Sequence, residues 1–314
     1  YLFSLVLSAS AVLTMTGCVS LPFEIAGDVI EATGDVVETA VEVPVDVATS
    51  VATAPFHDHF HAKYTEYPQW DLDTKEIHAI RLDLPNGSVK VRGGDEGPYY
   101  VSARVEVYAR SESAAHDCVD GMLPLMKTED GVHRIYHASP FHTRHYSCQV
   151  HYEIMVPTAM DLDITTQNAK TEVVNVSGDL KIQSQNGDIT LRSCAGTLNL
   201  STQNGEIDAE TLASRGPAKI DTQNGSIRLA LSEIGGPMDV QSSNGSIQLR
   251  LPQDFQGRVD ARNENGSLSS DLPIRVGQGT RHQLTGVIGG QEQPVLLLRS
   301  QNGDISLQVN DGGM

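Results

Sequence analysis

Aromatic side chains are nearly absent from the second half of this sequence. Phe, Trp and Tyr make up 5% of the 314 residues, and Phe255 is the only one after Tyr152. A carbohydrate site built on stacked aromatic rings is therefore not expected beyond residue 152. The chain also lacks a phosphate-binding glycine loop, a Gly-x-Ser-x-Gly motif and a His-Glu-x-x-His motif, which are signatures of nucleotide-binding enzymes, serine hydrolases and zinc proteases. We predict no catalytic residues, no enzyme activity and no cofactor.

Positive charge is also scarce. The chain has 22 Lys and Arg against 40 Asp and Glu, a formal net charge of −18, and residues 19–55 contain no Lys or Arg. Nucleic-acid binding needs clustered cations that neutralise phosphates, so nucleic acid is excluded as a partner. The same balance disfavours a polyanionic polysaccharide. A neutral glycan or another protein of the cell envelope remains as a partner class.

One dipeptide recurs through the second half of the chain. Its asparagines are spaced by 18, 18, 20, 20, 21 and 37 residues. They are Asn168, Asn186, Asn204, Asn224, Asn244, Asn265 and Asn302, and all but Asn168 are followed by glycine. A fixed period of this size is typical of a repeat architecture, and the interval of 37 is long enough to contain one degenerate repeat.

Each repeat contains a short alternating segment before its asparagine. Leu180, Ile182 and Ser184 lead to Asn186, and similar residues recur in later repeats. Residues two apart share one face of a strand, so two apolar residues, a hydroxyl and the asparagine are expected to point inward. We predict an all-β fold, a β-solenoid with coils of about 18–21 residues in which the asparagines stack as a structural ladder. The alternative is an antiparallel sheet of hairpins that turn at Asn-Gly.

The segments around the repeats are similar to those of a known family. Leu84-Pro85-Asn86-Gly87-Ser88 and Ile154-Met155-Val156-Pro157, followed by Leu162-Asp163-Ile164 and the Asn-Gly coils, resemble the bacterial putative-adhesin domain family. The likeness covers about residues 77–309. It implies a β-solenoid of a kind often tethered to cell envelopes, and it carries over no catalytic residues.

The N-terminal residues predict export and lipidation. An apolar stretch from Leu2 to Met15 is followed by Thr16-Gly17-Cys18, which resembles the cleavage motif of bacterial lipoproteins. We predict a lipoprotein signal peptide at residues 1–17, a lipidated Cys18 and an acidic tether over residues 18–55. The protein is then expected to be exported and anchored by lipid to the bacterial cell envelope, at the outer membrane on its periplasmic or surface face.

Histidines and aromatics are concentrated before the repeats. Ten of the eleven histidines lie between His57 and His151. We predict that residues 56–156 form a β lobe capping the first coils and that residues 157–310 form the solenoid. Because an exported protein meets an oxidising compartment, Cys118 and Cys148 are predicted to form a disulfide. The later histidines of the lobe, expected to be mostly exposed, are His133, His137, His142, His145 and His151.

Two further groups are candidates for a site. His57, His59 and His61 are weak candidates for a metal site, since imidazole binds Zn, Cu and Ni, and a solvated segment is the preferred interpretation. Asp188 and Glu206 would be neighbours on adjacent coils, and such a carboxylate pair is a candidate for glycan cleavage. The preferred interpretation of the pair is a polar corner, because short acceptors suit a turn.

Together these features predict a lipid-anchored envelope protein whose β-solenoid is a non-catalytic scaffold or an adhesion-type binding module. Two alternatives are a polysaccharide-acting enzyme built on a β-helix and a periplasmic metal-binding factor. The three hypotheses differ in whether Cys18, the Asp188–Glu206 pair or the N-terminal histidines carry the function.

Overall fold

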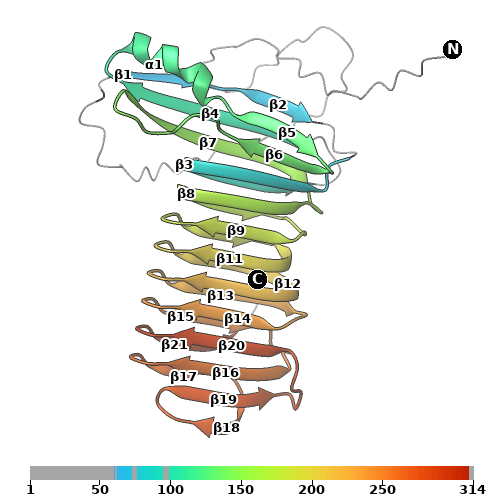
Figure 1. Ribbon diagram of the computed structural model, residues 1–314. Coiled ribbons are helices and arrows are strands. Elements are labelled where there is room, and N and C mark those ends of the chain that lie inside the picture. Colours follow the sequence, from blue (N-terminus) through green and yellow to red (C-terminus); the bar gives the residue numbers. More distant parts are fainter. Residues whose placement is uncertain (1–59, 61, 73–75, 95–98, 311–314) are drawn as a thin grey trace, which may run out of the picture. The chain divides into compact units, whose positions relative to one another are not determined.

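The strands of this protein form a stack of coils. The computed structural model describes residues 60, 62–72, 76–94 and 99–310, except the side chains of 275–279. The described residues belong to the second of two units, residues 56–314. A sheet of 21 strands runs through this unit, with a helix beside its first strands (Figure 1).

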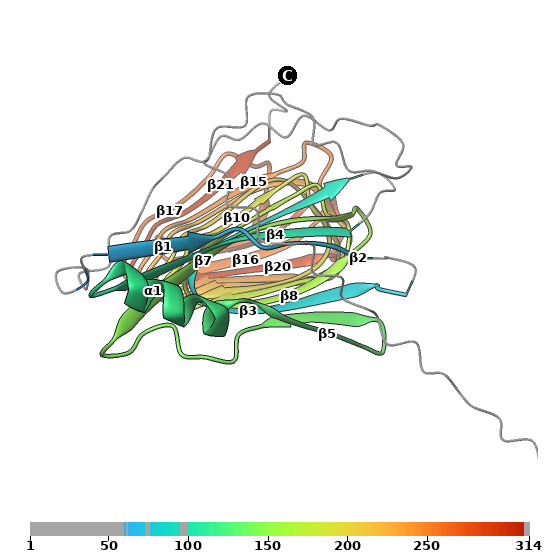
Figure 2. The same ribbon diagram turned by 90° about the horizontal axis from the view of Figure 1, so that it is seen from above.

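Most coils contribute one strand before the Asn-Gly corner and one after it. The coil strands are β3 (Ala79–Gly94), β8 (Asp161–Val174), β9 (Leu180–Ser184), β10 (Ile189–Arg192), β11 (Ala195–Thr202), β12 (Ile207–Thr222), β13 (Ile227–Ile234), β14 (Met238–Ser242), β15 (Ile247–Leu251), β16 (Gly257–Asn263), β17 (Leu268–Ser270), β20 (Val295–Ser300) and β21 (Ile305–Val309). Seen from above, they form two facing walls, one with β8, β16 and β20 and the other with β10, β15, β17 and β21 (Figure 2).

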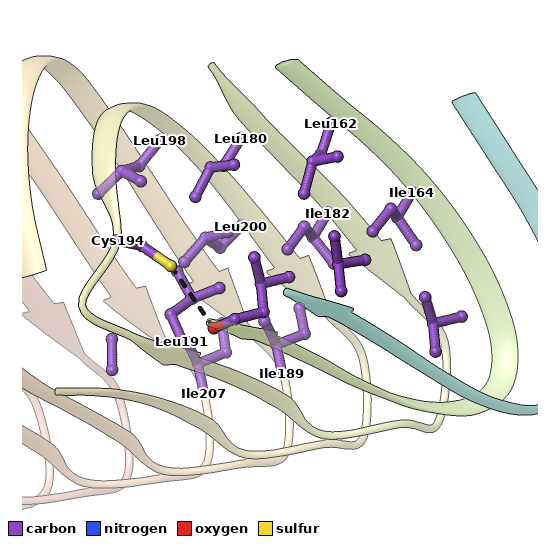
Figure 3. Packing of buried hydrophobic residues seen from close by; sticks show 14 of the residues in the cluster. Leu162, Ile164, Leu180, Ile182, Ile189, Leu191, Cys194, Leu198, Leu200 and Ile207 are labelled. Carbon is purple, nitrogen blue, oxygen red and sulfur yellow. Dashed lines mark hydrogen bonds between the residues drawn. The ribbon is translucent and has the colours of Figure 1, made fainter. Parts of the chain in front are cut away.

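Successive coils pair in parallel and in register. Leu162 of β8 lies beside Leu180 of β9, which lies beside Leu198 of β11, and the column continues through Ala218 and Met238. The apolar side chains of neighbouring coils therefore pack on one another inside the stack (Figure 3). Burial of these side chains stabilises the contact between coils. The predicted β-solenoid is confirmed, and the alternative hairpin sheet is wrong because the coil strands pair in parallel.

The first coil lies upstream of residue 157, where the solenoid was predicted to begin. β3 pairs in parallel with β8 from Ala79 beside Asp161 to Arg92 beside Val174, and this register places Asn86 beside Asn168. The chain between β3 and β8 forms most of the lobe. Its elements are β4 (Tyr99–Ala109), α1 (Glu112–Val119), a 3-10 turn (Asp120–Met122), β5 (Leu125–Glu129), β6 (Val132–Tyr136) and β7 (Tyr146–Pro157).

The lobe continues the sheet beyond the first coil. β7 pairs in parallel with the second half of β3, and β4 pairs antiparallel with β7. β4 also pairs with β1 (Ala62–Glu66) and β2 (Gln69–Leu72). The start of α1 is fixed by Ser111, whose hydroxyl accepts a hydrogen bond from the Ala114 N–H at 3.2 Å. The parallel coils are thus closed at this end by antiparallel strands.

The order of the last coils in space differs from their order in sequence. β20 pairs with β14 on one side and with β16 on the other, and β21 likewise lies between β15 and β17. The coil of β16 and β17 is therefore the outermost coil. The chain then returns, and its final coil, formed by β20 and β21, lies between that coil and the coil of β14 and β15. The 37-residue interval contains no degenerate repeat; it contains β18 (Arg275–Gly279) and β19 (Gln283–Ile288), a hairpin that pairs antiparallel with β16.

Candidate functional site

The repeated asparagines form a continuous chain of side-chain hydrogen bonds. Each amide nitrogen donates to the amide oxygen of the neighbouring coil over 2.6–2.9 Å. In donor-to-acceptor order the chain runs Asn265, Asn302, Asn244, Asn224, Asn204, Asn186, Asn168, Asn86. Asn86 is an eighth member beyond the seven predicted, and its Asn-Gly dipeptide is the sequence signal that identifies it.

The asparagines lie on the outside of the coils, so their predicted inward orientation is wrong. Asn186 is exposed, whereas Ser184, two residues earlier, is buried. β9 ends at Ser184, and the alternation of inward and outward residues ends with the strand. The inward polar column consists instead of Thr166, Ser184, Thr202, Thr222, Ser242, Ser300 and Asn263.

The buried hydroxyls connect neighbouring coils. The Thr202 hydroxyl donates to the carbonyl of Gly187 at 3.1 Å and accepts from the N–H of Gly205 at 3.2 Å. Thr222, Ser242 and Ser300 donate to the glycine carbonyls of the coils beside them. These bonds satisfy backbone groups that would otherwise be buried without a partner.

The corner glycines are required by close packing between coils. A Cβ atom added to Gly205 would lie 2.2 Å from the carbonyl oxygen of Gly187, and one added to Gly225 would lie 1.8 Å from that of Gly205. Neither glycine has a positive φ. The Asn-Gly pair is therefore a site of backbone contact between coils and not a hairpin turn.

The carboxylates proposed for glycan cleavage have structural partners. Asp188 accepts a hydrogen bond from the backbone N–H of Glu206 at 2.9 Å. The carboxylate of Glu206 forms an ion pair with Arg228. Asp161 makes the same kind of contact as Asp188, accepting from the N–H of Asp179 at 2.7 Å. Asp188 and Asp161 thus hold the backbone of the next coil, and Glu206 holds the side chain of Arg228, as expected for polar corners.

The predicted disulfide is not formed, because Cys118 and Cys148 are both free. Cys148 lies in β7 with its side chain fully buried, and Cys118 is partly buried on α1. Burial raises the pKa of the Cys148 thiol to about 12, with a smaller contribution from the charge of Glu106. Disulfide formation proceeds through a thiolate, and Cys148 is held as a protonated, apolar group.

Three of the five later lobe histidines are covered, contrary to expectation. His133 is buried, His137 and His151 are half-buried, and His142 and His145 are exposed. Burial lowers the pKa of His133 to about 4. The pKa of His137 is lowered by burial to about 4 as well, against the opposing effect of a hydrogen bond to the Met122 carbonyl at 3.0 Å. The sequence patterns did not predict a strand over residues 132–136. Within that strand, β6, the alternation of side chains places His133 on the apolar face.

A shallow apolar hollow of about 410 Å³ lies on the outer side of the coil wall. It extends over β11, β12, β14 and β20, and its exposed or half-exposed apolar side chains are Pro217, Pro237, Val295 and Leu297. Asn199, Lys219 and Asp239 line it as well, and Asp239 forms an ion pair with Arg299 at 3.5 Å. Few other outward positions of this wall are apolar, so the hollow is a candidate contact surface.

Several predicted positions lie outside the described residues. These are Cys18, the signal peptide at 1–17, the tether at 18–55, and His57, His59 and His61. Within the described ranges, no group of three or more His, Cys, Asp or Glu side chains is arranged to hold a metal ion. The helices found in those ranges are too short or too polar to span a bilayer.

The coil array matches a known family. Residues 158–308 match the model of the family described as Toastrack DUF4097. No curated protein sequence matches this chain.

Solved bacterial structures are similar at low identity. A "putative lipid binding protein" from Parabacteroides distasonis ATCC 8503 is 11% identical over 77% of this chain and 96% of its own, with a TM-score of 0.41. A "putative adhesin" from Bacteroides fragilis NCTC 9343 is 12% identical over 77% of this chain and 96% of its own, with a TM-score of 0.37. The family similarity of this chain is that of residues 158–308 to Toastrack DUF4097.

Proposed function

We propose that this chain is a lipid-anchored protein of the bacterial cell envelope whose coil array is a rigid, non-catalytic binding scaffold. The supporting observation is that the polar side chains at the corners form hydrogen bonds between coils. Their amides, hydroxyls and carboxylates are bonded to neighbouring coils, as at Asn204, Thr202 and Asp188. A surface whose polar groups hold the coils together suits presentation of a fixed surface to a partner.

The hollow over β11, β12, β14 and β20 is the contact surface of this scaffold, and its partner is an envelope protein. Its apolar lining suits an apolar side chain of a partner, while Lys219, Asp239 and Arg299 provide both signs of charge nearby. Apolar centres with a polar, charged rim are typical of protein–protein contacts. A glycan is disfavoured here because the hollow contains no aromatic ring.

Membrane attachment is tested with a Cys18→Ala variant expressed in bacteria. Wild-type protein is expected in the membrane fraction with a mass increase on the Cys18 peptide, and the variant in the soluble fraction. Equal membrane attachment of both proteins would refute the lipid anchor, while leaving the binding scaffold to be tested separately.

Partner binding is tested by photo-crosslinking from position 297 in living cells. We expect one dominant crosslinked protein, and we expect Pro237→Asp to abolish that crosslink because it places a charge in the hollow. Lys170→Asp, an exposed change on β8 away from the hollow, is the matched control and should leave the crosslink intact. Crosslinks that are insensitive to Pro237→Asp, or crosslinking to glycan alone, would contradict the proposed partner.

A further inference from the structure

The hydrogen-bonded chain of asparagine amides contains Asn-Gly dipeptides, which are prone to deamidation. In Asn-Gly, the glycine backbone nitrogen, once deprotonated, attacks the asparagine Cγ and forms a ring. The Cγ–Nδ2 bond breaks, ammonia leaves, and water opens the ring to aspartate or isoaspartate. Asparagine is accordingly a labile residue. The asparagines of the Asn-Gly pairs are exposed at Asn186, Asn204, Asn224, Asn244, Asn265 and Asn302.

Ring formation requires the side chain to leave its place in the chain of amides. Asn204 donates to Asn186 at 2.6 Å and accepts from Asn224 at 2.7 Å, so its rotation breaks two hydrogen bonds. The attacking nitrogen of Gly205 is held as well, since its N–H donates to the Thr202 hydroxyl at 3.2 Å. Internal members of the chain are therefore restrained against the reaction.

The two ends of the chain of amides are not equivalent. At one end, Asn86 is half-buried and its oxygen accepts from Asn168 at 2.7 Å. Gly87 packs under the lobe, because a Cβ added there would lie 1.8 Å from the carbonyl oxygen of Val150. Lobe strand β7 thus covers this end.

At the other end, Asn265 is exposed and donates to Asn302 at 2.9 Å. No described side chain donates to the Asn265 amide oxygen. It lies in the outermost coil, whose strand β17 pairs with β21 alone among the described strands. Rotation of Asn265 therefore breaks one side-chain hydrogen bond where an internal asparagine breaks two.

We propose that Asn265 is a site of spontaneous deamidation in the folded protein and that the hydrogen-bonded chain of amides protects the internal Asn-Gly pairs. This inference goes beyond the proposed scaffold function. An aspartate at 265 cannot donate to Asn302. Isoaspartate also adds a backbone atom beside Gly266, where a Cβ would already lie 2.3 Å from the Gly303 carbonyl oxygen. The modification consequently loosens the outermost coil first.

Peptide mapping by mass spectrometry after incubation of the intact protein at mildly alkaline pH tests the proposal. Asn265 is expected to deamidate about tenfold faster than Asn186, Asn204, Asn224 and Asn244, since tenfold corresponds to about one net hydrogen bond. In urea-unfolded chain the Asn-Gly pairs should react at similar rates. Internal pairs that react as fast as Asn265 in the folded protein would overturn the proposal.

An Asn265→Ser variant moves the end of the chain of amides by one coil. Asn302 then loses its incoming hydrogen bond and should deamidate about tenfold faster than in wild type. Gln301→Ser is the matched control, because Gln301 is an exposed neighbour in the same coil outside the chain of amides, and it should leave the Asn302 rate unchanged. An unchanged Asn302 rate in Asn265→Ser would contradict the protective role of the chain of amides. If either variant unfolds, the comparison of Asn265 with the internal asparagines in the wild-type protein still tests the proposal.

Discussion

At the residue scale, Thr171 occupies a position that isoleucine fills in the following coils. It lies beside Val89 on one side and Ile189 on the other, and its side chain is fully buried. Its hydroxyl has no hydrogen-bond partner among the described residues. A buried hydroxyl without a partner is destabilising, whereas the hydroxyl of Thr202 bonds to two backbone groups. The same residue type thus has opposite effects at two buried positions.

Exchange of each threonine for valine should reveal this difference. Thr171→Val is expected to raise the free energy of unfolding by about 1 kcal/mol, because it removes an unpaired polar group. Thr202→Val should lower it by about 1–3 kcal/mol, since it leaves two buried backbone groups without partners. Urea unfolding of both variants measures the change, and a destabilised Thr171→Val would show that its hydroxyl has a partner.

The corner glycines give a second prediction. Gly205→Ala should destabilise the fold by about 1–3 kcal/mol or more, because the new methyl group overlaps the Gly187 carbonyl. Gly94→Ala is the matched control, since a Cβ there meets no atom within 4 Å. Thermal and urea unfolding should separate the two variants, and equal stabilities would mean that the coils can move apart at no cost.

At the element scale, the lobe differs from the coils in what its strands bury. β6 places His133 at 2% exposure, with Nδ1 2.8 Å from the Thr128 hydroxyl. The ring of His133 also meets the ring of Tyr99 edge to face, with centroids 5.4 Å apart. The neighbouring His137 contacts the Tyr152 hydroxyl through Nε2 at 2.8 Å. These imidazoles make the lobe a pH-sensitive part of the fold, because each must be buried in its neutral form.

The lobe should lose stability in mild acid. Unfolded histidine titrates near pH 6.5, whereas the folded pKa of His133 is about 4. The contribution of His133 is therefore complete above about pH 6.5 and declines as the pH falls toward 4, by up to about 3 kcal/mol. Urea unfolding at pH 7.5, 5.5 and 4.5 should show this fall, and His133→Phe should reduce it. A pH-independent stability over this range would contradict the assignment.

At the scale of the whole described unit, the return of the chain makes the last strands internal. β20 and β21 have coil neighbours on both sides, although they come last in sequence, whereas β17 has one. In a repeat stack each coil is stabilised by its neighbours, so a coil between two others is more stable than an end coil. The final strands thus form an internal coil that connects the outermost coil to the rest of the stack.

Hydrogen exchange should follow the order in space. Amides of residues 295–309 are expected to be protected about as strongly as those of 238–251, and more strongly than those of 268–270. A chain that ends before residue 295 should lose the coil of β16 and β17 as well, because that coil pairs with β20 and β21. Exchange that is fastest at 295–309 would contradict the inserted position.

The sequence by itself determined the all-β solenoid and the column of asparagines, because a fixed period places like residues at like positions in every coil. It also indicated Asp188 and Glu206 as a polar corner. The sequence also predicted that Ser184 faces inward. Tertiary structure alone decided that Asn186 faces outward, because the alternation ends where β9 ends. It likewise decided the order of the last coils and the burial of His133, since both depend on contacts between segments far apart in sequence, which a local pattern does not encode.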